Sequence, residues 1–462
     1  MAEPESGGKP ERVFFVSLGC PKNRVDSELM LGELVKRDYR IVSNAEEADL
    51  LVVNTCSFVE EAREESVDAI LDLVSVKEGA QDKRIVVAGC LPQRYAEELE
   101  KELPEVDLFI GTGDVGRIGE LLDSRTLASP AHVSSVAAGR KLTRPGYNYD
   151  AYSPRVRTTD PWTAYVKVAE GCSQVCSFCI IPRLRGGARS RTMSDIVLEV
   201  RQLAEQGVKE INLIAQDLSH YGDDLKDGSD LEGLLRELSR IDGIAWIRLL
   251  YCYPHKFTDG LIDLIACEPR IISYVDMPLQ HISDPLLEIM RRRFSEADTR
   301  ALVARMRDRI PDLVFRTTFI VGHPGESESD FRRLLDFVEE SRFERVGVFK
   351  YSTEEGTRSA RRTDLVTTLE KEDRYHRLMS LQQGISAELS QRWVGREVDL
   401  LVEGVSKETE LLLQARTWAQ APEIDGMTYV NEGWAEPGSL VRAEIIEAGD
   451  YDLVARILSG TG

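Results

Sequence analysis

Three closely spaced cysteines, Cys172, Cys176 and Cys179, form a C-x3-C-x2-C pattern in the middle of the chain. Cysteine thiolates hold iron–sulfur clusters, and three ligands to a four-iron cluster leave one iron open to a substrate or cofactor. The alternative is a structural zinc site, but such sites have four closed ligands, usually in paired C-x2-C spacings. No histidine or fourth cysteine stands near the pattern in the sequence. The spacing therefore favours an open iron–sulfur cluster.

Three further cysteines, Cys20, Cys56 and Cys90, share one local arrangement. Each follows a short, uniformly apolar segment, at 13–16, 50–53 and 85–88, that is typical of a buried parallel strand. Parallel α/β sheets place their sites just past the carboxyl ends of the strands. Neighbouring strands lie about 4.8 Å apart, so three such loops can bring three sulfurs to one cluster. Three separate buried thiols are the alternative, because free cysteine often packs as a small apolar residue.

The first part of the chain alternates strand and helix patterns. Helical periodicity at 27–37 and 60–74 separates the apolar segments, and a fourth strand is expected at 106–110. This order predicts a parallel α/β domain over residues 12–125. Residues 1–11 are rich in Gly, Pro and Glu and predict a disordered tail, whereas 126–157 have no clear periodicity and predict a linker.

A second strand–helix series fills residues 158–393. Six strands are expected, at 165–169, 210–215, 246–251, 274–278, 314–321 and 345–351, with helices such as 195–205, 231–240 and 328–341 between them. Six such units predict an open (β/α)6 partial barrel with its site at the carboxyl ends of the strands. A long helix at about 369–394 closes this domain.

The last part of the chain, residues 394–462, has a different pattern. Short strands expected at 398–402, 411–415, 427–430, 440–446 and 452–457 indicate a small antiparallel β-barrel. From Glu388 onward there are 14 acidic and six basic residues, a net charge of −8.

The whole chain of 462 residues has a net charge of −21 and 42% hydrophobic residues. This charge argues against a general attraction to nucleic acid, although a local basic patch could survive it. No apolar run is long enough to cross a bilayer and no signal peptide is evident, so we expect a cytoplasmic protein with no membrane contact. Its thiols are then reduced, and a disulfide scaffold explains the clustered cysteines poorly. Cys252 and Cys267 have no partners in the pattern and are expected to be packing residues.

The pattern around Cys172, including Phe178 before the last cysteine, resembles the radical S-adenosylmethionine (SAM) superfamily. With the second trio and the small barrel, nearly the whole chain looks like the methylthiotransferase family. The motifs are Ser17-Leu-Gly-Cys-Pro-Lys-Asn23, Asp26-Ser-Glu28, Asn54-Thr-Cys56, Gly89-Cys90 and Gly171-Cys172 through Arg191. The resemblance implies two 4Fe-4S clusters and a TRAM-like last domain. Cys172, Cys176 and Cys179 would hold the cluster that cleaves SAM, and Cys20, Cys56 and Cys90 the cluster that carries sulfur. A second SAM would supply the methyl group.

Two branches of that family differ in substrate. One adds a methylthio group to isopentenyl- or threonylcarbamoyl-adenosine in tRNA, and the RimO type modifies the β-carbon of an aspartate in ribosomal protein S-twelve. Several stretches resemble the second branch, namely Leu18-Gly-Cys-Pro-Lys-Asn23, Gln216-Asp217 with Tyr221-Gly222, Tyr351-Ser-Thr-Glu-Glu-Gly-Thr357, Ala421-Pro-Glu-Ile-Asp-Gly426 and Asp450-Tyr-Asp-Leu453.

Charge provides an independent argument, because a barrel that grips tRNA should be basic, whereas an acidic one suits a basic ribosomal protein. A basic protein substrate is therefore expected rather than tRNA, together with an external electron donor and sulfide or another sulfur donor. The resemblance is imperfect at Arg24, where an apolar residue is expected, and at His323, where an aromatic residue is expected. A third alternative, a non-catalytic iron–sulfur electron-transfer or scaffold protein, leaves the barrel-sized domain behind Cys172 unexplained.

Four residues near expected strand ends or the cysteine loop are candidate SAM contacts: Gln216, Gln280, Thr318 and Arg191. For each, an ordinary loop hydrogen bond or a solvated charged turn is the competing interpretation. Hydrogen-bonded structural roles are expected for His281 and His323. The basic run Arg291-Arg-Arg293 is expected to be a solvated helix end.

Overall fold

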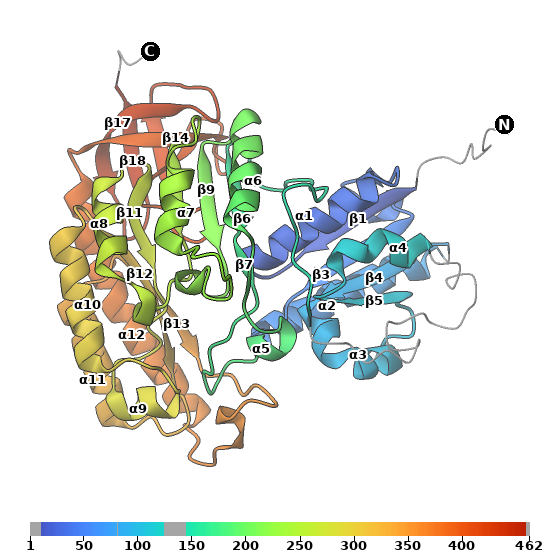
Figure 1. The fold of residues 1–462 in the computed structure, drawn as a ribbon, viewed down its shortest axis with the longest axis horizontal. Helices are drawn as coiled ribbons and strands as arrows, with labels where there is room; N and C mark the ends of the chain where they lie inside the picture. The colour runs from blue at the N-terminus through green and yellow to red at the C-terminus, as the bar shows by residue number, and fades with distance from the viewer. Residues whose placement is uncertain (1–10, 81, 124–144, 459–462) are drawn as a thin grey trace. The chain divides into compact units, whose positions relative to one another are not determined.

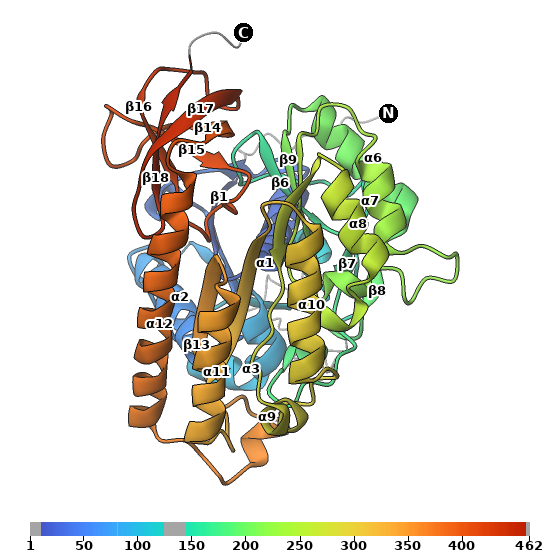
Figure 2. The same cartoon turned by 90° about the vertical axis from the view of Figure 1, so that its left-hand side faces the viewer.

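The computed structural model describes residues 11–80, 82–123 and 145–458. The chain divides into two compact units (Figures 1 and 2). Unit 1 consists of residues 1–158, 170–174 and 180–189, and unit 2 of residues 159–169, 175–179 and 190–462. The expected tail, except Glu11, and the first part of the expected linker, up to residue 144, lie outside the described residues.

Unit 1 is built on a five-stranded parallel sheet in the order β2-β1-β3-β4-β5. Its strands are β1 (Arg12–Ser17), β2 (Arg40–Ile41), β3 (Leu50–Thr55), β4 (Arg84–Gly89) and β5 (Leu108–Gly111). Successive residues of β3, such as Val52 and Val53, enter apolar clusters on opposite faces of the sheet. Both faces are covered, which explains why these strands are apolar throughout. The two-residue β2 was not predicted, because it is too short to form a pattern.

The helices of unit 1 are α1 (Pro21–Val35), α2 (Glu60–Glu78), α3 (Cys90–Glu102), α4 (Ile118–Asp123) and α5 (Ile181–Leu184), with 3-10 turns η1 (Ala45–Glu47) and η2 (Val115–Arg117). Helix α1 begins at Pro21, six residues before its expected start. Proline suits a first helical turn because it lacks the N–H that would have no partner there. Polar residues buried in the first turns, such as Asn23 and Asp26, hide the apolar periodicity.

Unit 2 contains a six-stranded parallel sheet in the order β13-β12-β11-β10-β9-β6, as expected for an open (β/α)6 barrel. Its strands are β6 (Thr163–Lys167), β9 (Glu210–Ile214), β10 (Trp246–Leu249), β11 (Ile271–Asp276), β12 (Val314–Val321) and β13 (Arg345–Lys350). The short strands β7 (Ala169–Glu170) and β8 (Arg189–Ser190) pair with each other, and each has one residue in unit 1 and one in unit 2. The expected bounds of β12 are those observed.

Helices of unit 2 pack along this sheet around one large apolar core (Figure 2). They are α6 (Met193–Glu205), α7 (Leu231–Leu238), α8 (Asp259–Cys267), α9 (Asp284–Ile289), α10 (Glu296–Arg309), α11 (Glu328–Ser341) and α12 (Thr368–Ser390), with 3-10 turns η4 (Leu218–His220), η5 (Pro254–Lys256), η6 (Ser359–Arg361) and η7 (Gln391–Trp393). The predicted bounds of α11 are correct, and its start is fixed by a capping box between Ser327 and Asp330.

The last strands close into a barrel in the order β14-β15-β16-β18-β17. They are β14 (Glu397–Val405), β15 (Leu413–Thr417), β16 (Thr428–Glu432), β17 (Leu440–Ala448) and β18 (Leu453–Ile457). The barrel is antiparallel as expected, except that β16 and β18 run parallel. The exception arises because the chain runs from β16 through the reversed strand β17 into β18, so β16 and β18 point the same way. Strand β18 pairs with β16 on one side and with β17 on the other.

A buried ion network joins this small barrel to the (β/α)6 sheet within unit 2. Glu210, the first residue of β9, lies 2.6 Å from Arg416 of β15 and 2.9 Å from Arg248 of β10, and all three side chains are at most 3% exposed. Arg248 also donates to the backbone oxygens of Trp418 and Gln420. The loop after β15 therefore closes the amino-terminal end of the sheet.

In the part of the chain that the structure describes, no helix is both long and apolar enough to span a membrane.

Replacing Glu210 with Gln should destabilise unit 2, because two buried guanidinium groups would lose their shared carboxylate. Loss of one member of a buried ion network costs about 3 to 5 kcal/mol. Urea unfolding followed by tryptophan fluorescence measures the change. As a control, Glu397→Gln removes an exposed pair with Arg442 and should cost less than about 1 kcal/mol. Equal effects of the two changes would contradict the role of Glu210.

Candidate metal centres

The cysteines of unit 1 lie at the carboxyl ends of three adjacent strands. Cys20 follows β1 and caps α1, Cys56 follows β3, and Cys90 follows β4 as the first residue of α3. Because β1, β3 and β4 are neighbours in a parallel sheet, these ends meet at one edge. The structure thus brings together the three cysteines that the sequence grouped.

The glycine before two of these cysteines is required by the backbone. Gly19 and Gly89 have φ values of +86° and +101°, which favour glycine. A Cβ atom on Gly19 would lie 2.8 Å from Cβ of Cys56, and one on Gly89 would lie 2.3 Å from Oδ1 of Asn54. Each Gly-Cys pair therefore allows the chain to turn sharply at the end of its strand and brings the thiol close to its neighbours.

The three thiols are close enough to influence one another electrostatically. Burial is the main cause that raises the pKa of Cys56 to about 12, and the neighbouring thiols Cys90 and Cys20 contribute to this increase. Burial also acts to raise the pKa of Cys20, but Lys22 and Arg185 lower it below its usual range. Cationic groups therefore stabilise a thiolate in this cluster of thiols.

Three thiols at one sheet edge fit a four-iron cluster. No group of three or more Cys, His, Asp or Glu side chains in the described ranges could hold a single metal ion. A cluster has a different requirement, because each ligand binds a different iron and the sulfurs need not converge on one point. The donor set and its neighbouring cations suit a cluster with one open iron.

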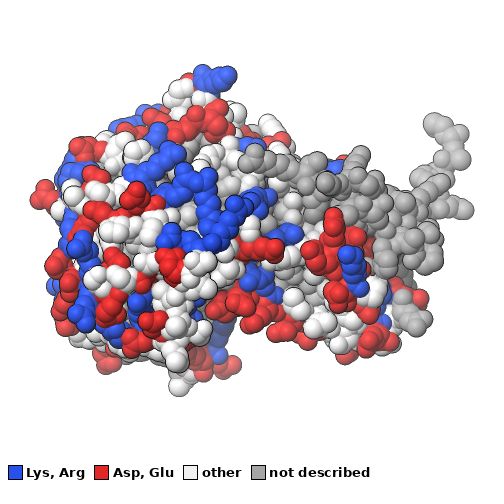
Figure 3. Space-filling model, turned by 90° about the horizontal axis from the view of Figure 1, so that it is seen from below, with Lys and Arg blue, Asp and Glu red and all other residues white. Residues whose placement is uncertain are grey.

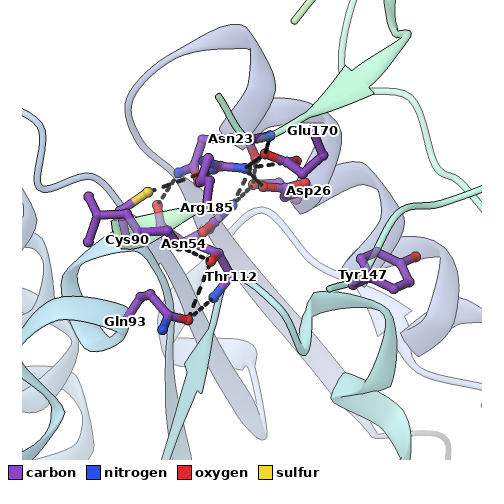
Figure 4. A network of polar contacts seen from close by, with 12 residues as sticks. Asn23, Asp26, Asn54, Cys90, Gln93, Thr112, Tyr147, Glu170 and Arg185 are labelled. Carbon is purple, nitrogen blue, oxygen red and sulfur yellow. Dashed lines mark hydrogen bonds and ion pairs between the residues drawn. The ribbon is translucent and has the colours of Figure 1, made fainter. Parts of the chain in front are cut away.

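Arg185 lies at the centre of a buried polar network beside Cys90 (Figure 4). Its Nη1 lies 2.8 Å from Asp26 and 3.1 Å from Glu170. Its Nη2 donates to Oδ1 of Asn23 at 3.2 Å and reaches Sγ of Cys90 at 3.7 Å. The Arg185 side chain is 2% exposed, so these contacts are shielded from water.

The segment that carries Arg185 is anchored by β5 and α3. Thr112 donates its hydroxyl to the backbone oxygen of Leu184 at 2.6 Å, and its N–H donates to Gln93 at 3.0 Å. Arg185 was not predicted as a site residue, because nothing in the sequence around it shows that its side chain is buried against Cys90.

The C-x3-C-x2-C loop contributes residues to both units, and its parts are described separately. In unit 1, the N–H of Cys172 donates to the backbone oxygen of Gly186 at 3.1 Å, and its Sγ accepts from the N–H of Gln174 at 3.4 Å. In unit 2, Ser177 lies between the other two cysteines. Its backbone N–H donates to the backbone oxygen of Met290, and its backbone oxygen accepts from the N–H of Ser359.

Arg292 is a second residue that was not predicted as part of the site and that contacts one of the cysteines. Its Nη1 lies 3.6 Å from Sγ of Cys176, its Nη2 donates to the oxygen of Pro278, and its guanidinium stacks on Tyr253. The prediction that Arg291-Arg-Arg293 is a solvated helix end is therefore wrong for Arg292. A sequence pattern cannot show that a long side chain turns inward to a distant cysteine.

The four candidate SAM contacts have different surroundings in unit 2. Gln280 follows β11 with φ +73°, a strained value for a non-glycine residue that is typical of functional sites. Its N–H donates to the oxygen of Thr318 in β12, so these two candidates are neighbours. Gln216 lies two residues past the end of β9. The guanidinium of Arg191 pairs with Asp195 and Glu199, which anchors α6.

The histidines and remaining cysteines differ in their environments. Burial lowers the pKa of His323 to about 4, and its ring bonds Pro324 and Ser359, so it is a neutral structural residue. His281 bonds Glu326. Cys252 is buried, as expected for packing, but Cys267 is exposed at the end of α8, so a packing role is wrong for it.

Three family models match successive parts of the chain: the first parallel sheet, the six-stranded sheet and the small barrel. The uncharacterized protein family UPF0004 matches residues 12–111, the radical SAM superfamily residues 166–338 and the TRAM domain residues 394–458. Among solved structures, the radical S-adenosylmethionine methyltransferase TsrM from Kitasatospora setae has a TM-score of 0.51 at 15% identity. That likeness covers 74% of this chain and 75% of that chain and shows a shared fold.

Close relatives match almost the full length. A ribosomal protein uS12 methylthiotransferase RimO from Geobacter sulfurreducens is 50% identical over 97% of this chain and 99% of that protein. One from Anaeromyxobacter sp. is 51% identical over 97% of this chain and 93% of that protein. These matches confirm the resemblance that the cysteine motifs indicated. The chain belongs to the RimO family of ribosomal protein uS12 methylthiotransferases.

Proposed function

We propose that this protein adds a methylthio group to the β-carbon of an aspartate in ribosomal protein uS12, using two 4Fe-4S clusters and SAM. The observation that carries the proposal is the meeting of Cys20, Cys56 and Cys90 at one sheet edge, in a chain that also has the C-x3-C-x2-C loop. A single radical cluster needs only the cysteines of the C-x3-C-x2-C loop. The additional trio of Cys20, Cys56 and Cys90, which would leave one iron open, fits a sulfur-carrying centre.

In this proposal, Cys172, Cys176 and Cys179 hold the radical cluster, and Cys20, Cys56 and Cys90 the sulfur-carrying cluster. When bound, the clusters and SAM supply radical hydrogen abstraction, the sulfur and the methyl group. Gln216, Gln280 and Thr318 would orient SAM at the carboxyl ends of the barrel strands. Arg191 contributes indirectly, because it holds α6 and the strand that precedes the cysteine loop through the backbone oxygen of Lys167.

The protein's own residues also control charge near the radical cluster. Arg292 directs a cation at Cys176, and a cation that donates to a ligand sulfur offsets the negative charge of a thiolate-ligated cluster. His323 packs edge-on against Phe178 of the loop, and its low pKa keeps it neutral at physiological pH. The loop therefore receives one fixed cation from Arg292 and no titrating charge from His323.

The surface of the last barrel supports a basic protein substrate. Asp399, Glu432, Glu436 and Glu447 are among its exposed carboxylates. The negative charge is not uniform over the molecule, because the face in Figure 3 carries groups of both signs. An acidic barrel attracts a basic ribosomal protein and repels tRNA, so tRNA adenosine is the less favoured substrate.

The proposal also covers the partners of the enzyme, its location in the cell and the bounds of its domains. An external reductant and sulfide or another sulfur donor must supply electrons and sulfur, and ribosomal protein modification implies a cytoplasmic location. The functional parts are the methylthiotransferase α/β domain at 12–125, the radical SAM core at 158–393 and the TRAM-like barrel at 394–462.

Anaerobic turnover of uS12 with reconstituted enzyme, reductant, sulfide and SAM should add about 46 Da to one aspartate, the mass of a methylthio group in place of hydrogen. Mass spectrometry of tryptic peptides measures this product. A Cys176→Ala variant should give none. Methylthioadenosine in tRNA treated in the same way, with unmodified uS12, would contradict the proposed substrate and leave the chemistry in place.

Alanine at Cys20, Cys56 or Cys90 should remove about half of the bound iron, because one of two clusters would lose a ligand. Iron and sulfide analysis of the reconstituted protein measures the loss. Cys252→Ala and Cys267→Ala are matched controls that should retain full iron. Undiminished iron in all three single variants would contradict the ligand assignment.

Reversing charge in the Glu432→Lys, Glu436→Lys double variant should raise KM for uS12 about three- to tenfold, because rim charges mainly change the rate of association. The effect should shrink as salt rises. Glu60→Lys, Glu61→Lys, at the start of α2, is the matched control and should leave KM unchanged. Equal KM values for the two double variants would argue against docking on the barrel.

A further inference from the structure

We propose that Arg185 is a positioning residue for the sulfur-carrying cluster: it holds Cys90 in place and raises the reduction potential of that cluster. This inference rests on the proposed function, because it assumes that Cys20, Cys56 and Cys90 are cluster ligands. It goes further by assigning a role to a residue outside the cysteine motifs.

The first argument is the division of the guanidinium between two sets of partners. Nη1 faces the carboxylates of Asp26 and Glu170, whereas Nη2 faces Asn23 and the sulfur of Cys90 (Figure 4). A planar guanidinium with all these contacts cannot rotate without losing several of them. The two carboxylates therefore fix the direction in which Nη2 donates.

The second argument is burial. Arg185, Asp26 and Glu170 are 2%, 2% and 8% exposed, so water does not screen the guanidinium from the sulfur. A cluster gains one negative charge when it is reduced. A cationic donor against a ligand sulfur stabilises that reduced form and raises the potential, which depends on hydrogen bonds to the sulfurs and on net charge.

The third argument concerns Asn23, which links the network to the other cysteine loops. Its Nδ2 donates to the backbone oxygen of Leu18, two residues before Cys20, at 2.6 Å. The same atom lies 3.3 Å from the oxygen of Thr55, the residue before Cys56. Its Oδ1 accepts from Arg185. Arg185 thus touches one ligand directly and reaches the loops of the other two through Asn23.

The test uses the full-length chain in a Cys172→Ala, Cys176→Ala, Cys179→Ala background, so that the N-terminal cluster can be observed alone. An electron paramagnetic resonance titration gives its midpoint potential. Arg185→Gln should lower the potential, and Arg185→Lys should lower it less, because lysine keeps the charge but not the forked geometry. Glu170→Gln should raise it, because this variant removes a negative charge and keeps the guanidinium.

The opposite signs separate this role from a structural one, which would reduce cluster content in all variants without opposite shifts in potential. Arg155→Gln is the matched control: Arg155 pairs with buried Glu28 in the same unit, and the potential should not change. Equal potentials in Arg185→Gln and the parent protein at full iron content would overturn the proposal. Absence of any cluster in the parent background would instead overturn the proposed function of the three cysteines.

Discussion

Every strand of a parallel sheet delivers its carboxyl end to the same edge, and the proposed chemistry of this protein depends on that constraint. In unit 1 it places Cys20, Cys56 and Cys90 after β1, β3 and β4. In unit 2 it places Gln216 and Gln280 past the ends of β9 and β11. Helices cover both faces of the first sheet, so its edge is where loops can present side chains. Two sheets in one chain therefore provide two separate places for a reactive centre.

Sequence patterns predicted the strands well where burial is uniform and the helices well where caps are explicit. Strand β12 and helix α11 have their expected bounds, because the apolar run and the Ser327–Asp330 capping box are local signals. The start of helix α1 was predicted too far along the chain, because its first turns bury polar residues, such as Asn23 and Asp26, that bond Arg185 beside Cys90. The parallel pairing of β16 and β18 depends on which strands meet around a closed barrel, and no local pattern encodes that.

The candidate sites show the same limit. The cysteines could be grouped from their identical position after apolar segments, which is a local signal. Arg185 and Arg292 could not be assigned, because the direction of a long cationic side chain depends on carboxylates, carbonyls and sulfurs far away in sequence. Arg191 illustrates the reverse case: it stands beside the cysteine loop in sequence, but Asp195 and Glu199 engage its guanidinium.

The loop after β15 has a consequence for how molecules enter and leave unit 2. Its backbone oxygens at Trp418 and Gln420 accept from Arg248, and Asp425 accepts from the hydroxyl of Tyr274, so the amino-terminal end of the sheet is closed by protein. A barrel open at both ends could admit a cofactor on one side and a substrate on the other. With the amino-terminal end closed, the carboxyl ends of the strands, where Gln216 and Gln280 lie, are the side of unit 2 on which small molecules are expected to bind.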